Sequence, residues 1–127
     1  MTQIKAQLNG LRLSPRKVRL VVGLLKRKSL QTALDQLSFM AKRPSAPLAK
    51  LLQSAAANAE NTYKLDRDTL FIKDMWVDEG VKLKRYRAKG FGRANPIEKK
   101  TSRVSVVLES RAPKVAEKTA EKATANA

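Results

Sequence analysis

Two residue types that carry much protein chemistry are missing from this sequence. Its 127 residues include no cysteine and no histidine. Without cysteine, disulfides and thiolate metal sites are excluded, which fits a reducing compartment. Without histidine, the chain lacks the commonest general acid–base and the commonest zinc ligand. Only Asp, Glu, Lys and Tyr would remain for catalysis, so we expect a protein that is not an enzyme and holds no metal and no cofactor.

Long apolar runs are also missing. The apolar stretches fall far short of the ~20 residues that a membrane-spanning helix needs, so we expect no membrane insertion. The first residues, Met1 to Lys5, lack the apolar segment of a signal peptide. The sequence therefore predicts a cytoplasmic protein.

Acidic residues are scarce. The 27 Lys and Arg residues face 11 Asp and Glu residues, which gives a net charge of +16. Such a charge repels itself unless a polyanion neutralises it. Nucleic acid is the first candidate partner and an anionic membrane the second. Residues 1–34 hold eight basic residues and no acid, and residues 81–103 hold nine basic residues and one acid. This clustering predicts an oriented basic surface.

Hydrophobic patterning predicts a chain of mixed helices and strands. Alternation of apolar and polar residues predicts a strand over 3–9 that ends at Gly10. A helix is expected to begin at Ser14–Pro15, because serine is a preferred N-cap and proline is tolerated at the first helical position. The remaining expected elements are helices that begin at Ser29 and near Ser45 and strands over 70–77 and 103–109.

The segment Lys82–Lys100 lies between the last two expected strands. It contains eight basic residues and three large apolar side chains, Leu83, Tyr86 and Phe91. Charges at this density cannot be buried unpaired. The glycines of Lys89–Arg93 favour a tight turn, so we expect a β-hairpin that stands clear of the core, with arms of about ten residues, roughly 30 Å long. Pro96 is expected to make the pairing irregular. A disordered basic loop is the alternative for the free protein, because an isolated hairpin is marginal in water.

Three functions are compatible with this arm. In the first, Lys and Arg neutralise RNA phosphates while Tyr86 and Phe91 stack on bases. In the second, a DNA-compacting architectural protein of the nucleoid type inserts a wedge such as Phe91 into the minor groove. The third is an RNA-modifying enzyme that uses Asp78 and Glu79, although a metal site there is disfavoured because successive strand residues point to opposite faces. Trp76 is expected in the core.

Three stretches of the chain match the motifs of one known family in order and spacing. They are LSPRKVRLVVGLLKRKSLQTALDQL, SAAANAEN, and VDEG followed by a basic hairpin and KKTSRVSVVL. On this basis the chain resembles, over roughly residues 10–110, the bacterial form of the large-subunit ribosomal protein numbered twenty-two. Family hairpins commonly carry Pro-Arg-Ala just before the tip, where this chain has Ala88-Lys89-Gly90.

The resemblance implies an α+β fold of three helices packed on a small three-stranded antiparallel sheet, with a long protruding β-hairpin. It implies a structural constituent of the large ribosomal subunit. Such a protein binds large-subunit ribosomal RNA, bridges several RNA domains during assembly, and lines the nascent-peptide exit tunnel with its hairpin. The implied partners are this RNA, neighbouring large-subunit proteins and the nascent polypeptide, in the cytoplasmic ribosome and without homo-oligomers.

We therefore expect one RNA-binding domain over residues 1–111, with its hairpin at 81–103, and a flexible tail over 112–127. The residues expected to bind ribosomal RNA are Arg16, Lys17, Arg19, Lys82, Lys84, Arg85, Arg87, Lys89, Arg93, Lys99, Lys100 and Arg103. The expected tunnel tip comprises Ala88, Lys89, Gly90, Phe91, Gly92 and Arg93.

Overall fold

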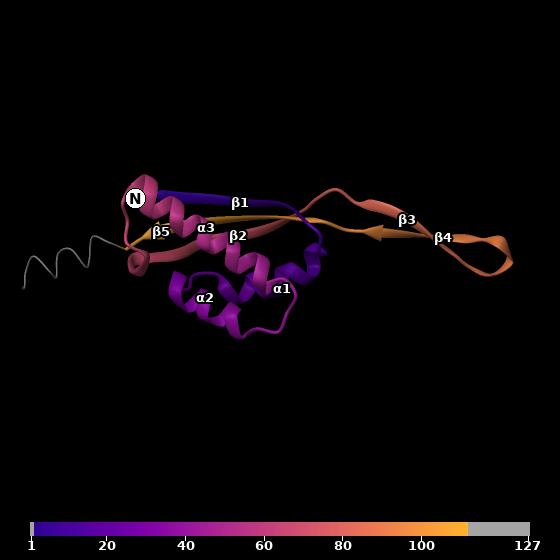
Figure 1. Cartoon of the computed structure of the whole chain (residues 1–127), viewed down its shortest axis with the longest axis horizontal. Helices are drawn as coiled ribbons and strands as arrows, with labels where there is room; N and C mark the ends of the chain where they lie inside the picture. Colours follow the sequence, from indigo (N-terminus) through magenta and orange to yellow (C-terminus); the bar gives the residue numbers. More distant parts are fainter. Residues whose placement is uncertain (1, 112–127) are drawn as a thin grey trace, which may run out of the picture.

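The computed structural model describes residues 2–111 and has the predicted α+β fold. Three helices lie against a three-stranded antiparallel sheet, and a separate two-stranded hairpin extends from one end of that sheet (Figure 1). The expected tail over 112–127 lies outside the described residues. In chain order the elements are β1 (Gln3–Leu11), α1 (Pro15–Leu25), α2 (Leu30–Phe39), α3 (Ser45–Tyr63), the 3-10 turn η1 (Arg67–Thr69), β2 (Leu70–Glu79), β3 (Leu83–Ala88), the tip turn η2 (Gly90–Gly92), β4 (Ala94–Lys99) and β5 (Ser102–Ser110).

The last strand of the chain is the centre of the sheet. The strand order is β1-β5-β2, and all neighbours are antiparallel. Leu108 of β5 lies opposite Ile4 of β1 on one side and Ile72 of β2 on the other. The side chains of this row are at most 1% exposed. Burial of each such side chain contributes about 1.5–3 kcal/mol, so this row of the sheet is a main source of stability.

The helices begin where the sequence predicts, although their caps differ. Pro15 occupies the first turn of α1, but the side chain of Ser14 makes no capping hydrogen bond. Ser29 does cap α2, because its Oγ accepts a hydrogen bond of 3.3 Å from the backbone N–H of Thr32. The apolar stripe of α1 (Val18, Val21, Val22 and Leu25) faces the core and is buried. Helix α1 packs on β2, α3 packs on β1, and α2 packs on α3.

Two sequence-based expectations about the core sheet are wrong. Gly10 does not end β1, which continues to Leu11 through an irregularity after Leu8. Gly10 takes a φ of +70°, a conformation open to glycine, so the strand bends there instead of stopping. Trp76 is not a core residue. Its neighbours Met75 and Val77 are buried under the helices, whereas Trp76 points to the opposite face and is 39% exposed.

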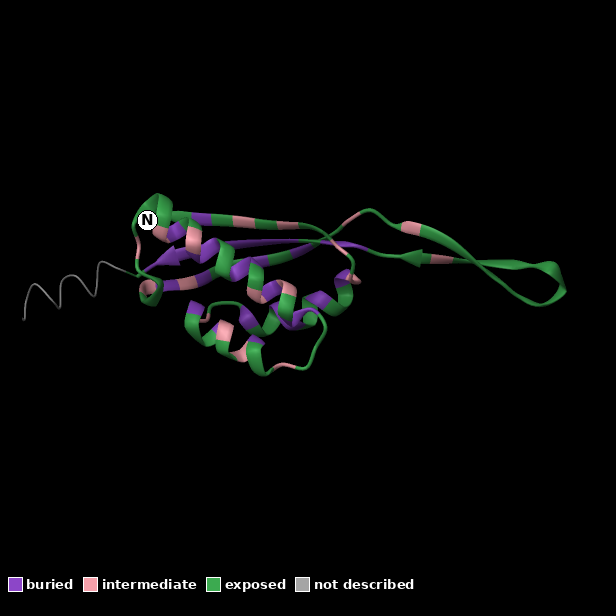
Figure 2. Cartoon of the chain, viewed as in Figure 1, coloured by how far each residue is buried: buried purple, intermediate pink, exposed green. Residues whose placement is uncertain are grey.

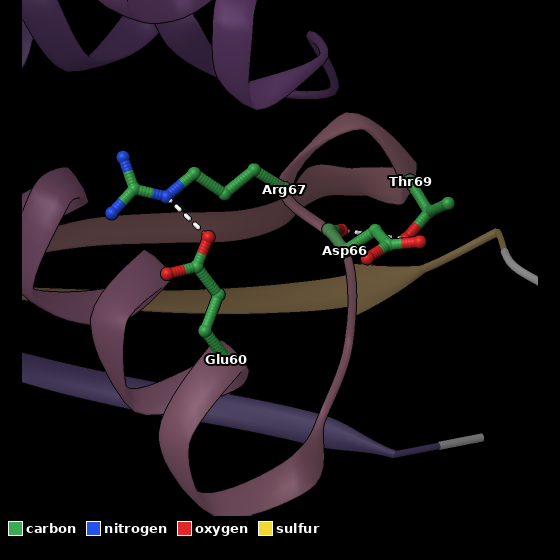
Figure 3. Close-up of polar contacts among 4 residues, drawn as sticks. All are labelled: Glu60, Asp66, Arg67 and Thr69. Carbon is green, nitrogen blue, oxygen red and sulfur yellow. Dashed lines mark hydrogen bonds and ion pairs between the residues drawn. The ribbon is translucent and has the colours of Figure 1, made fainter.

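A short polar turn connects α3 to β2. Helix α3 ends at Lys64, which has a φ of 55° and donates its backbone N–H to the carbonyl of Ala59. Figure 3 shows Arg67 reaching back to α3, where its Nε donates to Oε1 of Glu60. In the same view, the hydroxyl of Thr69 donates to the carbonyl of Asp66 at 2.8 Å. These contacts fix the direction in which the chain enters β2.

Candidate nucleic-acid interface

The hairpin root is held by contacts between Gly80 and Thr101. The backbone N–H of Gly80 donates to the carbonyl of Thr101 at 2.9 Å. The hydroxyl of Thr101 donates to the carbonyl of Val81 at 2.6 Å. A Cβ placed on Gly80 would overlap Oγ1 of Thr101. The glycine of the VDEG motif is therefore the residue that lets the two arms cross closely where they leave the sheet.

The arm itself is a regular antiparallel ribbon. Pairing runs from Leu83 opposite Lys99 to Ala88 opposite Ala94 without a shift in register. Each strand has six residues, or about 20 Å at ~3.3 Å per residue, so the paired part is shorter than expected. The expectation that Pro96 disturbs pairing is wrong. Both strands of a two-stranded ribbon are edge strands, so a proline that lacks an N–H can be accommodated there.

The tip is a tight turn around an exposed aromatic residue. Lys89 N–H donates to the carbonyl of Arg93 at 2.7 Å, and Arg93 N–H donates to the carbonyl of Gly90 at 3.4 Å. Phe91 and Gly92 have φ values of 60° and 70°. A type I′ hairpin turn requires positive φ at both central residues, and its first central position usually holds Asn, Asp or Gly. The left-handed backbone conformation of Phe91 is unfavourable for a non-glycine residue by about 1–2 kcal/mol. Its side chain is fully exposed to solvent.

Positive charge along the arm is largely uncompensated. Figure 2 shows the hairpin as almost wholly exposed, in contrast to the sheet and helices. Within residues 2–111, its only ion pair joins Nζ of Lys82 to Oε2 of Glu98 at 3.9 Å. Arg85 donates to the carbonyl of its neighbour Lys84 at 2.8 Å, which leaves its charge unpaired. The other expected RNA-binding residues of the arm are exposed as well, namely Lys84, Arg87, Lys89, Arg93, Lys99 and Lys100. The arm is thus a slender cationic surface.

Arg103 lies outside the arm. It belongs to β5 and is opposite Asp78 in the core sheet, although its side chain is exposed. Among residues 2–111, no group of three or more His, Cys, Asp or Glu side chains could hold a metal ion, and Asp78 and Glu79 take part in no such group. No helix among the described residues is long and apolar enough to cross a membrane.

The expected basic cluster on α1 is divided by the structure. Arg16 and Arg19 lie on one flank of the helix, because residues three apart share a face. The guanidinium of Arg19 donates through Nε and Nη2 to the carbonyl of Val77, at 3.2 and 3.0 Å. Arg19 therefore joins α1 to β2 as well as carrying charge. Lys17 lies on the other flank, where it lines a groove with Leu20.

Sequence reasoning missed two further basic residues. Lys42 and Arg43 belong to the loop between α2 and α3, and they line the same groove as Lys17. Both are exposed. In the sequence they are a basic pair before Pro44, a pattern that by itself indicates only that a helix ends there. The loop brings them near α1, and that placement depends on the packing of α2 on α3.

Comparisons with known proteins agree on one family. Residues 6–109 match the family described as Ribosomal protein L22p/L17e. A large ribosomal subunit protein uL22 of Pelotomaculum thermopropionicum is 50% identical over 106 residues, which cover 84% of this chain and 94% of that protein. The uL22 of Desulfitobacterium hafniense strain Y51 is 47% identical over 108 residues, covering 85% and 95% of the two chains. The uL22 of Citrifermentans bemidjiense is 52% identical over 104 residues, covering 81% and 93%.

A basic α+β fold with an exposed cationic arm, together with these relatives, defines a structural protein of the large ribosomal subunit. Within that class, the chain belongs to the Ribosomal protein L22p/L17e family. Its role is structural and not enzymatic, and its place is the cytoplasmic ribosome. The family resemblance seen in the sequence motifs is thereby confirmed.

Proposed function

We propose that this protein binds large-subunit ribosomal RNA through two basic surfaces and thereby bridges separate RNA segments during assembly. The first surface is the hairpin arm, and the second is the exposed face of α1 with Arg16. The proposal rests on the uncompensated charge of the arm. Its described residues make one ion pair and are almost entirely exposed. A cationic arm of this kind gains stability when RNA phosphates surround it.

The proposal favours RNA over the DNA-binding alternative, because the chain belongs to a ribosomal protein family. Double-stranded RNA is recognised mainly through its shape, its phosphates and its 2′-hydroxyl groups. The exposed lysines and arginines of the arm suit phosphate contacts, and Arg can in addition stack on bases. Neighbouring large-subunit proteins would complete the surroundings of the globular part. A homo-oligomer is not part of this function.

We further propose that the hairpin tip lines the nascent-peptide exit tunnel, with residues 88–93 facing the nascent polypeptide. Support comes from the family resemblance and from the slender, extended form of the arm (Figure 1). A photoreactive side chain at Lys89 should crosslink to a stalled nascent peptide in translating ribosomes. Absence of that crosslink, with crosslinks only to RNA, would contradict a tip that faces the peptide.

The RNA-binding role is tested with the double variant Lys84→Ala, Arg85→Ala. Affinity for large-subunit ribosomal RNA is measured from about 50 to 200 mM salt, and its logarithm is plotted against the logarithm of the salt concentration. Each phosphate contact that the substitutions remove should lower the slope by about 1. The matched control is Lys50→Ala, which removes an exposed lysine of α3 outside both basic surfaces. Equal slopes for the double variant and the wild type would contradict phosphate contacts at the arm.

A further inference from the structure

A groove runs along α1 on the side away from Arg16. One hollow, of about 470 Å³, is bounded by α1 and α2 and includes Leu24, Phe39 and Met40. A second hollow, of about 480 Å³, is bounded by α1 and the loop after α2 and includes Leu20, Leu24 and Met40. The hollows share Leu24 and Met40 as lining residues, so they are adjacent along α1, and we call the two together the α1–α2 groove.

The α1–α2 groove is apolar and unoccupied by the described part of the chain. Leu20 is 71% exposed, Leu24 is 54% exposed and Phe39 is 90% exposed. Single exposed apolar residues are ordinary, but a contiguous apolar patch beside a polar rim is typical of a binding site. These residues face away from the core, whose stripe on α1 is complete without Leu20 and Leu24. Their arrangement therefore indicates a partner that lies outside the globular core.

The rim of the groove is cationic. Lys17, Lys42 and Arg43 line the second hollow, and their side chains make no ion pair or hydrogen bond with any residue between 2 and 111. Lys28 lines the first hollow and donates to an amide oxygen, so its charge also stays unpaired. Asp35 is the one acid among the described lining residues. The partner must therefore be negatively charged and also offer an apolar surface.

RNA meets both requirements. Every nucleobase has a flat π face that stacks on aromatic and apolar side chains, and the flanking phosphates supply negative charge. A basic segment of a neighbouring ribosomal protein would meet like charges at the rim, which is unfavourable. Lys17 adds a cation of α1 to the groove, on the flank of the helix opposite Arg16. We propose that the α1–α2 groove holds an unpaired nucleobase of large-subunit RNA against Phe39 and Leu24, with the adjoining phosphates at Lys17, Lys42 and Arg43.

This proposal rests on the proposed RNA-binding function and makes a separate prediction about the type of contact. Phe39→Ala removes a stacking surface but no charge. It should weaken binding to large-subunit ribosomal RNA roughly 5- to 150-fold and leave the salt slope unchanged. The double variant Lys42→Ala, Arg43→Ala should instead lower the slope by about 1 for each phosphate that these side chains neutralise. Phe39 is 90% exposed, so its replacement is not expected to affect folding.

The matched control is Tyr63→Ala, which removes an aromatic side chain that is 46% exposed at the far end of α3. Its affinity should equal that of the wild type. If Phe39→Ala also binds like the wild type, the groove does not hold a base, although the proposed RNA-binding function stands. If the wild-type chain itself shows no saturable RNA binding, the proposed function fails first. The two failures are therefore distinguishable.

A crosslinking experiment identifies the occupant directly. Phe39 is replaced by photoreactive p-benzoylphenylalanine, and the full chain is assembled into large subunits before irradiation. A crosslink to a single unpaired nucleotide is the expected result. A crosslink confined to another ribosomal protein would overturn the proposal, because the groove would then be a protein-docking surface. Crosslinks scattered over many nucleotides would also overturn it, since they indicate an unfilled groove.

Discussion

Gly80→Ala is the substitution that tests the hairpin root most directly. A Cβ at this position would overlap Oγ1 of Thr101 and lie 3.3 Å from its backbone carbonyl. Thr101 is 8% exposed, and its hydroxyl donates to the carbonyl of Val81 at 2.6 Å. The threonine side chain must therefore rotate in the variant, which breaks its hydrogen bond.

The expected effect on the free energy of unfolding is about 2 kcal/mol. Loss of the Thr101 hydrogen bond accounts for about 1 kcal/mol, and overpacking against the Thr101 backbone accounts for about 1 kcal/mol. Thr101→Ala removes the same hydroxyl, so it should cost about 1 kcal/mol alone. In that background, Gly80→Ala should cost only the remaining ~1 kcal/mol, which gives a coupling energy of about 1 kcal/mol between the two sites.

Urea denaturation of the wild type, both single variants and the double variant measures this coupling. For an m value of about 1–3 kcal/mol/M, Gly80→Ala should lower the midpoint by roughly 1 M. The control is Gly23→Ala in α1, where an added Cβ meets no atom within 4 Å. It should stabilise the protein by about 0.4–1 kcal/mol. If Gly80→Ala lowers the free energy of unfolding equally in the wild type and in the Thr101→Ala background, the Thr101 hydroxyl is not the obstacle. That result would refute the reasoning.

Three further outcomes follow from the same structure. Replacement of Lys84–Asn95 by a short turn should change the stability by no more than about 0.5 kcal/mol in a urea melt, because no residue of the arm belongs to the core cluster; a large loss would show that the arm supports the fold. Arg19→Ala should destabilise the free protein by about 1 kcal/mol through loss of its bonds to Val77, whereas Arg16→Ala should weaken RNA binding at unchanged stability. Equal melting of these two variants would contradict that division. Leu52→Ala should cost about 2–5 kcal/mol, since this side chain is 0% exposed, and a smaller loss in calorimetry would indicate a core that collapses around the gap.

Much of the fold could be predicted from local sequence signals. The apolar stripe of α1, its proline at the first turn and the serine before α2 define two helix starts within a residue or two. The glycines at 90 and 92 mark the hairpin turn because a tight turn needs positive φ, which Gly92 adopts. Charge density alone predicts that the arm is a surface for a polyanion. Such signals act within a few residues, so they are visible without knowledge of the fold.

Other features depended on residues far apart in the chain. Trp76 is a large aromatic residue of a kind usually found in cores. It is exposed because the helices cover the other face of the sheet. Phe91 was expected at the tip, but its positive φ and full exposure are set by the turn geometry. The sequence did not predict that Lys42 and Arg43 lie beside Lys17, because the α2–α3 loop brings these residues together.

By itself, then, the sequence determined the element types, the basic arm and the family of the protein, because periodicity, turn residues and charge are local properties. The tertiary structure decided how the surface is divided. Arg19 donates a hydrogen bond to the carbonyl of Val77, 58 residues away in the chain, whereas Lys17 on the same helix lines a groove. That division follows from which face of α1 packs on β2, and this packing is a long-range choice made by the whole core.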